Sequence, residues 1–89
     1  MPIEWHGYWL IKFADKGATE YTIPDSVTLI EGYAFSNCTS LEEVIFEENS
    51  KLTSIASYAF SGCTSLESIE LPNGVTSISS GAFQDCIMN

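Results

Sequence analysis

Residues 33–46 read YAFSNCTSLEEVIF, and residues 58–71 read YAFSGCTSLESIEL. These two stretches are nearly identical and start 25 residues apart in a chain of 89 residues. A third, weaker copy ends at Cys86, which lies 23 residues after Cys63. Self-similarity at a fixed period of this length is typical of a solenoid, in which each unit buries its apolar face against its neighbours. The repetition therefore predicts a stack of similar coils.

The repeated positions are apolar, whereas the positions between them vary among Ser, Thr, Glu and Gly. Superposing the copies aligns the three cysteines, the three Ala-Phe pairs and four further apolar sets: Cys38 with Cys63 and Cys86; Ala34-Phe35 with Ala59-Phe60 and Ala82-Phe83; Ile30 with Ile55 and Ile78; Val27 with Leu52 and Val75; Tyr21 with Val44 and Ile69; Ile23 with Phe46 and Leu71. Constant apolar positions predict that the same side chains face the core of every coil.

Each copy holds two short stretches that favour extended backbone. TSLE at residues 39–42 and 64–67 fits the capping box of a helix, but the EVIF and SIEL that follow are short, β-branched and alternating, which favours a strand. VTLI, LTSI and VTSI predict a second extended segment, and turn residues such as PDS and PNG separate the two. GYAFSNC and its relatives are expected to close each coil with one helical or 3₁₀-like turn. Each coil would then add one strand to a parallel sheet, about 4.8 Å from the next.

SLESIELPNGVTSISSGAFQDC, at residues 65–86, and its two relatives resemble the BspA-like class of leucine-rich repeats. Units of that class read Leu-x-x-Ile-x-Leu-Pro, then Val-x-x-Ile, then Ala-Phe-x-x-Cys, and the resemblance extends from Ala18 to Cys86. It implies a mainly-β leucine-rich repeat solenoid, with short parallel strands stacked into a concave sheet and short helical or 3₁₀ turns on the other side. It also implies a secreted or surface-exposed protein used in adhesion and protein recognition, with no catalytic residues.

Four segments follow from this register. Residues 1–17 form an N-terminal capping segment, and the units are residues 18–40, 41–65 and 66–89, the last incomplete. The first unit departs from the pattern, because Asp15 stands where a Cys is expected and Ala18 where a Leu is expected. YWLIKF at residues 8–13 predicts an added strand over the first coil. Its aromatic residues are expected to form a hydrophobic lid rather than a ligand site: Trp5, Trp9 and Phe13.

The charge balance is strongly acidic, with 12 Asp and Glu against three Lys and no Arg, a net charge of −9. Such a surface repels phosphate, which argues against nucleic-acid partners and anionic membrane surfaces. No apolar run approaches the ~18 residues of a membrane span, and the N-terminal residues lack the features of a signal peptide. Localisation is therefore left open by the residues, and only the resemblance suggests the cell surface or secretion.

Neither a catalytic nor a metal site is expected, and no cofactor is implied. The cysteines lack the close pairing of structural zinc sites, and parallel stacking separates them by more than a disulfide allows, so buried thiols are expected. His6 is the only histidine and has no acidic or nucleophilic neighbour in the chain. We therefore expect a protein that is not an enzyme.

Alternation along the predicted strands places carboxylates on the outer face of the sheet. Val44, Phe46, Ile69 and Leu71 would point inward, and the candidate binding residues would point outward or flank the strands: Glu20, Glu42, Glu43, Ile45, Glu47, Glu67 and Glu70. Carboxylates stacked one coil apart repel, and a basic protein segment or a divalent cation would relieve the repulsion. The alternatives are a solvated acidic face and a structural spacer from a longer repeat protein.

Two further surfaces are candidates for contacts. Tyr33 and Tyr58 align in successive copies, and they could form a contact patch or cover the core beneath the turn. The last coil has no predicted cap, so its apolar residues would meet solvent or another molecule: Ile69, Leu71, Ile78 and Phe83. This arrangement predicts end-to-end self-association or marginal stability.

Overall fold

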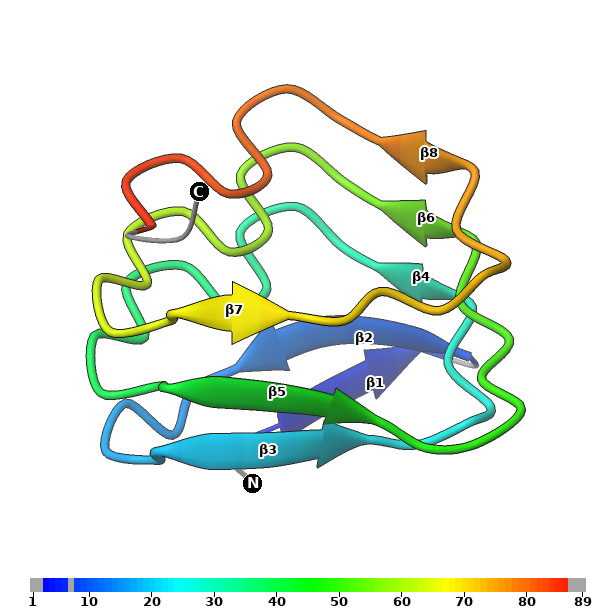
Figure 1. Ribbon diagram of the computed structural model, residues 1–89, viewed down its shortest axis with the longest axis horizontal. Helices are drawn as coiled ribbons and strands as arrows, with labels where there is room; N and C mark the ends of the chain where they lie inside the picture. The colour runs from blue at the N-terminus through cyan, green and yellow to red at the C-terminus, as the bar shows by residue number, and fades with distance from the viewer. Residues whose placement is uncertain (1–2, 7, 87–89) are drawn as a thin grey trace.

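The fold is a mainly-β solenoid of parallel strands, as the repeat predicted. The computed structural model describes residues 3–6 and 8–86, and only the backbone of residues 4–6. The coils lie one above another in chain order (Figure 1). Eight strands are present in the described chain: β1 (Ile3–His6), β2 (Trp9–Phe13), β3 (Glu20–Ile23), β4 (Leu29–Ile30), β5 (Glu43–Phe46), β6 (Ser54–Ile55), β7 (Ser68–Ile69) and β8 (Ser77–Ile78).

The strands form two sheets. The first has the order β3-β5-β7 and consists of the segments EYTI, EVIF and SI. The strands predicted at EVIF and SIEL are both present, but the second is limited to the two residues of β7. The second sheet has the order β1-β2-β4-β6-β8, and its last three members come from VTLI, LTSI and VTSI. These extended segments were predicted, but not that they pair into a sheet of their own. Each coil therefore crosses two sheets that enclose the core between them (Figure 1).

The register of both sheets matches the alignment of the copies. Glu20 is paired with Glu43, and Tyr21 with Val44. In the second sheet, Ile30 is paired with Ile55, and Ile55 with Ile78. Because parallel pairing places equivalent residues side by side, each aligned set becomes a column along the stack. The sequence alignment is thus the strand register.

A hairpin at the N-terminus covers the first coil on the side of the second sheet. The added strand predicted at residues 8–13 is present as β2, which pairs in parallel with β4. A further strand, β1, pairs antiparallel with β2 and was not predicted. Of the residues predicted to form a hydrophobic lid, Phe13 is buried and Trp9 is 42% exposed, while Leu10 of the same strand is fully buried. The side chain of Trp5 lies outside the described residues.

Single hydrogen-bonded turns close the coils, and the described residues contain no helix. The bonds are of the short i to i−3 kind, as in the donation from Ala34 N to the Glu31 carbonyl at 3.1 Å. The next amide points along the stack instead: Phe35 N donates to the carbonyl of Ala59 in the following coil at 2.7 Å. Left-handed residues, such as Asn37 with φ of 58°, end each turn. The backbone of the turns is therefore stacked in the same way as the strands.

A column of phenylalanine rings runs through the core, beside buried leucine, isoleucine and valine side chains and the smaller alanines and cysteines. Phe13, Phe35, Phe60 and Phe83 stack in order, with centroid distances of 5.0, 4.7 and 5.3 Å. Phe35 and Phe60 have no exposed surface. Offset-stacked rings in contact contribute about 0.5–1.5 kcal/mol beyond the area they bury. Phe13 and the phenylalanines of the three aligned Ala-Phe pairs thus form one continuous hydrophobic spine.

Candidate functional site

The outer face of the β3-β5-β7 sheet carries the acidic residues that the alternation predicted to point outward. Glu20 and Glu43 are paired in register and both are exposed, whereas the neighbouring Val44 is only 4% exposed. Ser68 continues the same row in β7. One column of this face therefore brings two carboxylates together, one coil apart, and its third member is the hydroxyl of Ser68.

An apolar side chain lies beside this column. Ile45 is 39% exposed, and its neighbour in β3 is Thr22, which is also exposed. Thr22 was not singled out from the sequence, although its alignment with Ile45 would have found it. A shallow hollow of about 320 Å³ follows β5 and β7, lined by Glu43, Val44, Ile45, Phe46, Ser68, Ile69 and Glu70. The face thus combines negative charge with a small accessible apolar area.

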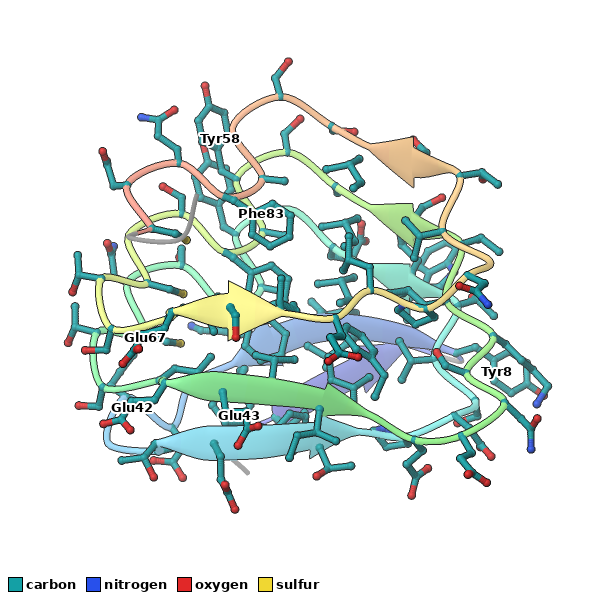
Figure 2. All side chains as sticks on the ribbon, in the orientation of Figure 1. Tyr8, Glu42, Glu43, Tyr58, Glu67 and Phe83 are labelled. Carbon is teal, nitrogen blue, oxygen red and sulfur yellow. The ribbon has the colours of Figure 1, made fainter. Side chains whose placement is uncertain are left out.

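A second acidic column stands where the strands begin. Glu42 directly precedes β5, Glu67 directly precedes β7, and both are exposed. Figure 2 shows these two side chains near the starts of their strands, with Glu43 projecting from β5. None of the three lysines lies in this sheet, because Lys12 is in β2, Lys16 is in a turn and Lys51 is in the loop before β6. The negative charge of the face has no cation within the sheet.

Glu47 differs from the other predicted binding residues. It follows β5 and is exposed, but its Oε1 accepts a hydrogen bond from the backbone amide of Asp25 at 2.8 Å. That amide belongs to the turn of the preceding coil. The structure thus gives Glu47 a role in joining two successive turns, which the sequence did not reveal.

The two aligned tyrosines lie in the closing turns, away from the acidic sheet. Their rings stack at a centroid distance of 5.4 Å and an interplanar angle of 14°. Tyr33 is 61% exposed, so it does not cover the core, while Tyr58 is half-buried. Both have left-handed backbone, with φ of 61° and 59°. In the third copy a Cβ at Gly81 would come within 2.4 Å of the Tyr58 ring, so the glycine leaves room for that ring.

The cysteines form a ladder of free thiols, as predicted. Cys63 donates to the carbonyl of Phe35 at 3.0 Å, and Cys86 donates to that of Phe60 at 3.2 Å. Cys38 lies 3.7 Å from the Phe13 carbonyl, a longer contact of the same kind. Each thiol therefore reaches the backbone one coil back, which satisfies a buried sulfur without a disulfide or a metal.

The first step of the ladder has a charge beside it that the sequence analysis missed. Lys16 Nζ donates to the carbonyl of Ser36 and lies 3.9 Å from Cys38 Sγ. Interaction with the Cys63 side chain and the charge of Lys16 outweigh burial and lower the pKa of Cys38 to about 7. The neighbouring side chain of Cys38 and desolvation raise the pKa of Cys63. The sequence contains one sign that the cysteine ladder changes in the first coil, because Asp15 stands at the position that Cys38, Cys63 and Cys86 occupy in the later coils.

The described residues contain no group of three or more side chains suited to hold a metal ion. The side chain of His6 lies outside the described part, so the structure gives it no role. Within the same residues, no helix has the length and apolarity needed to cross a membrane.

Comparisons with known proteins agree with this architecture. A family model described as "BspA type Leucine rich repeat region (6 copies)" matches residues 11–89. None of the curated proteins matches the chain. Among solved structures, a leucine-rich repeat protein of T. pallidum is similar to it, with 32% sequence identity and a TM-score of 0.78. The match covers 86% of this chain and 37% of the T. pallidum chain, so the protein studied spans well under half the length of that relative.

Proposed function

Since the chain belongs to the BspA-type leucine-rich repeat family, we propose that it is a protein-interaction module and not an enzyme. Repeat proteins of this architecture bind through an extended surface whose side chains are held by a rigid stack. The surface we assign to binding is the outer face of β3-β5-β7, and the partner is a basic segment of another protein.

The observation that supports this assignment is the pairing of Glu20 with Glu43 in register, with Glu42, Glu67 and Glu70 exposed around them. Like charges side by side are unfavourable in the free protein, so a cationic partner gains from relieving them. The net charge of −9 also attracts such a partner over a longer range and raises the rate of encounter.

The mechanism is presentation of fixed charges, without chemistry. Parallel strands hold equivalent carboxylates about 4.8 Å apart. An extended segment that lies across the strands can therefore place lysine or arginine side chains against both acidic columns. Ile45, 39% exposed, offers an apolar contact for the stems of those side chains. Preformed strands lose little freedom on binding, which favours affinity.

Titration of the 89-residue chain with a lysine-rich peptide tests the proposal, with a neutral peptide of equal length as reference. We expect saturable binding that weakens as salt is added, because exposed charges are screened. The double variant Glu43→Lys/Glu70→Lys is expected to weaken binding by at least about tenfold. These positions are exposed, so circular dichroism should show an unchanged fold.

The matched control is Glu31→Lys/Glu48→Lys, which changes the net charge equally. Glu31 follows β4 in the other sheet and Glu48 lies in the turn after β5, so neither is on the proposed face. Equal loss of binding in both double variants would show that the peptide responds to the net charge of the chain and not to the proposed face. Absence of saturable binding by the wild-type chain would contradict the proposal and leave the role of a structural spacer.

A further inference from the structure

A small pocket lies outside the acidic sheet, beside the starts of three strands of the second sheet. It has a volume of about 230 Å³ and is lined by Tyr8, Ser26, Thr28 and Lys51. Tyr8 directly precedes β2, Ser26 and Thr28 lie in the loop before β4, and Lys51 lies in the loop before β6. Figure 2 shows Tyr8 on the side of the stack where these strands begin. The fold thus brings together four side chains from three segments of the chain.

The polar groups of this pocket are not engaged elsewhere in the protein. Within the part of the chain that the structure describes, none of the four side chains makes a hydrogen bond or an ion pair. Thr28 differs in this from its counterparts, because Thr53 Oγ1 donates to the Thr28 carbonyl at 3.2 Å and Thr76 Oγ1 to the Thr53 carbonyl at 3.4 Å. The equivalent acceptor, the carbonyl of Tyr8, receives only the backbone amide of Thr28, at 2.9 Å. The Thr28 hydroxyl therefore remains available to a ligand.

The lining combines apolar surface with several hydrogen-bonding groups. Tyr8 is 67% exposed, so much of its ring is accessible, and Lys51 adds an aliphatic stem that ends in an ammonium group. The three hydroxyls of Tyr8, Ser26 and Thr28 can each donate and accept, and the ammonium group can donate three hydrogen bonds. Apolar walls with a few polar groups are the usual composition of a small-ligand site.

We propose that this pocket binds one ring of a neutral saccharide. A sugar ring has an apolar face of C–H groups and a rim of hydroxyls. It can therefore lie against the ring of Tyr8 while its hydroxyls pair with Ser26, Thr28 and Lys51. The volume of about 230 Å³ is below the range of about 300–1,000 Å³ for drug-sized ligands, which suits a single ring.

Two other classes of ligand fit the pocket less well. An apolar ligand would leave the hydroxyls and the ammonium group unpaired, which costs free energy. An anion would be attracted by Lys51, but the net charge of −9 opposes its approach. A neutral ligand with many hydroxyls avoids both costs.

The inference is independent of the proposed function, because the pocket and the acidic face share no residue. Binding of a basic peptide to the acidic face should weaken as salt is added, whereas binding of an uncharged ring should not change with salt. Failure of either proposal therefore leaves the other standing.

Nuclear magnetic resonance of the ¹⁵N-labelled 89-residue chain is the test. The neutral probes are glucose, galactose, mannose and N-acetylglucosamine, with glucuronate as an acidic sugar and glycerol as the reference for a simple polyol. We expect saturable shifts of the amide signals of Ser26, Thr28 and Lys51 with at least one neutral sugar, and none with glycerol. The Kd should be the same at about 0.01 M and about 0.5 M sodium chloride.

Two variants with matched controls locate the site. Tyr8→Ala should weaken binding by at least about tenfold, because it removes the aromatic wall. Its control is Tyr33→Ala, because Tyr33 is 61% exposed but lies in a closing turn. Thr28→Val should weaken binding about two- to tenfold through the loss of one hydrogen bond, whereas Thr53→Val, outside the pocket, should leave it unchanged.

Absence of saturable shifts with all four neutral sugars would overturn the inference. Binding of glucuronate alone, abolished by salt, would show instead that the pocket holds an anion on Lys51. Equal losses in Tyr8→Ala and Tyr33→Ala, or in Thr28→Val and Thr53→Val, would place the sugar elsewhere on the molecule. Circular dichroism checks the fold of each variant, and Tyr8→Leu repeats the comparison should Tyr8→Ala fail to fold.

Discussion

Cys38 differs from the other two cysteines in what surrounds its sulfur. All three thiols approach the carbonyl of a phenylalanine one coil back, but only Cys38 has a described lysine beside it, Lys16 at 3.9 Å. The pKa of Cys38 is lowered by the Cys63 side chain and, to a lesser extent, by Lys16, whereas the Cys38 side chain and desolvation raise the pKa of Cys63. Identical residues at equivalent repeat positions thus acquire different pKa values from their different neighbours.

Replacing Lys16 by methionine should raise the pKa of Cys38 from about 7 toward its ordinary value of 9.0. Between pH 7 and pH 9.0, Cys38 binds fewer protons in the native protein than in the unfolded chain, so the free energy of unfolding increases with pH over this range. The stabilising contribution of Cys38 is complete above pH 9.0 and is lost as the pH falls through about 7. The variant should flatten that dependence. Ultraviolet absorbance of the thiolate and urea denaturation between about pH 6 and 9 measure the two effects.

Lys51→Met is the control for this prediction, because it removes the same charge from an exposed loop residue outside the cysteine ladder. Thiolate titrations that coincide in Lys16→Met and the wild-type chain would contradict the assignment of Lys16. A shift of equal size in Lys51→Met would trace the effect to net charge alone.

The left-handed turn residues show how side chains in successive coils accommodate one another. Asn37 leans over Gly62, where a Cβ would come within 2.3 Å of its Oδ1, and the Tyr58 ring leans over Gly81 in the same way. Tyr33 has another tyrosine beneath it and stacks on that ring instead. A left-handed non-glycine residue is costly, by about 1–3 kcal/mol. The glycines therefore occur where a neighbouring side chain needs the space as well as where φ is positive.

At the scale of single elements, no strand or turn of this chain is stable alone. Strands of two residues, such as β6 and β8, bury little by themselves and depend on the coils on either side. The phenylalanine column links the coils, because each ring stacks on a ring of the neighbouring coil. Phe60 lies between two rings, at 4.7 and 5.3 Å, whereas Phe83 contacts one ring and is partly exposed.

Phe60→Ala is expected to lower the free energy of unfolding by about 3–5 kcal/mol, because it opens a cavity in the middle of the column. Phe83→Ala should cost clearly less, since its ring is partly exposed and has one stacking neighbour. Urea denaturation followed by circular dichroism gives both values. If Phe60→Ala does not fold, the same order should hold for Phe60→Leu and Phe83→Leu. A larger loss at Phe83 would contradict the spine as described.

At the scale of the whole molecule, charge opposes compactness. Twelve acidic residues and three lysines lie within 30 × 26 × 22 Å, which is comparable to the Debye length of about 30 Å at 0.01 M salt. At low salt every charge therefore acts on every other, and the paired carboxylates of β3 and β5 add a local repulsion. Screening should relieve both.

We expect the urea midpoint of the wild-type chain to rise from about 0.01 M to about 0.5 M sodium chloride, because screening relieves repulsion in the compact state. Glu43→Gln should raise the midpoint at low salt and have little effect at high salt. Potassium chloride serves as the control against an effect of one particular cation. A midpoint that is independent of salt would show that the acidic columns cost the fold nothing.

How much of this could be read from the sequence depends on whether a feature repeats. The pairing of Glu20 with Glu43 and of Ile30 with Ile55 was fixed by alignment alone, because parallel stacking converts sequence period into strand register. The outward direction of Glu43 and Ile45 followed from alternation along the strand. Fold class, register and the acidic face were therefore accessible without coordinates.

Features that occur once needed the tertiary structure. β1 lies outside the repeat, so no period could predict its antiparallel pairing with β2. The contact of Lys16 with Cys38 and the bond from Asp25 to Glu47 each join residues about twenty positions apart. Such contacts depend on how two coils are offset and on which rotamers fit, and neither is encoded in the repeat. The repeat set which residues stack, because stacking is a property shared by every coil; their individual neighbours were decided by the geometry of one particular stack.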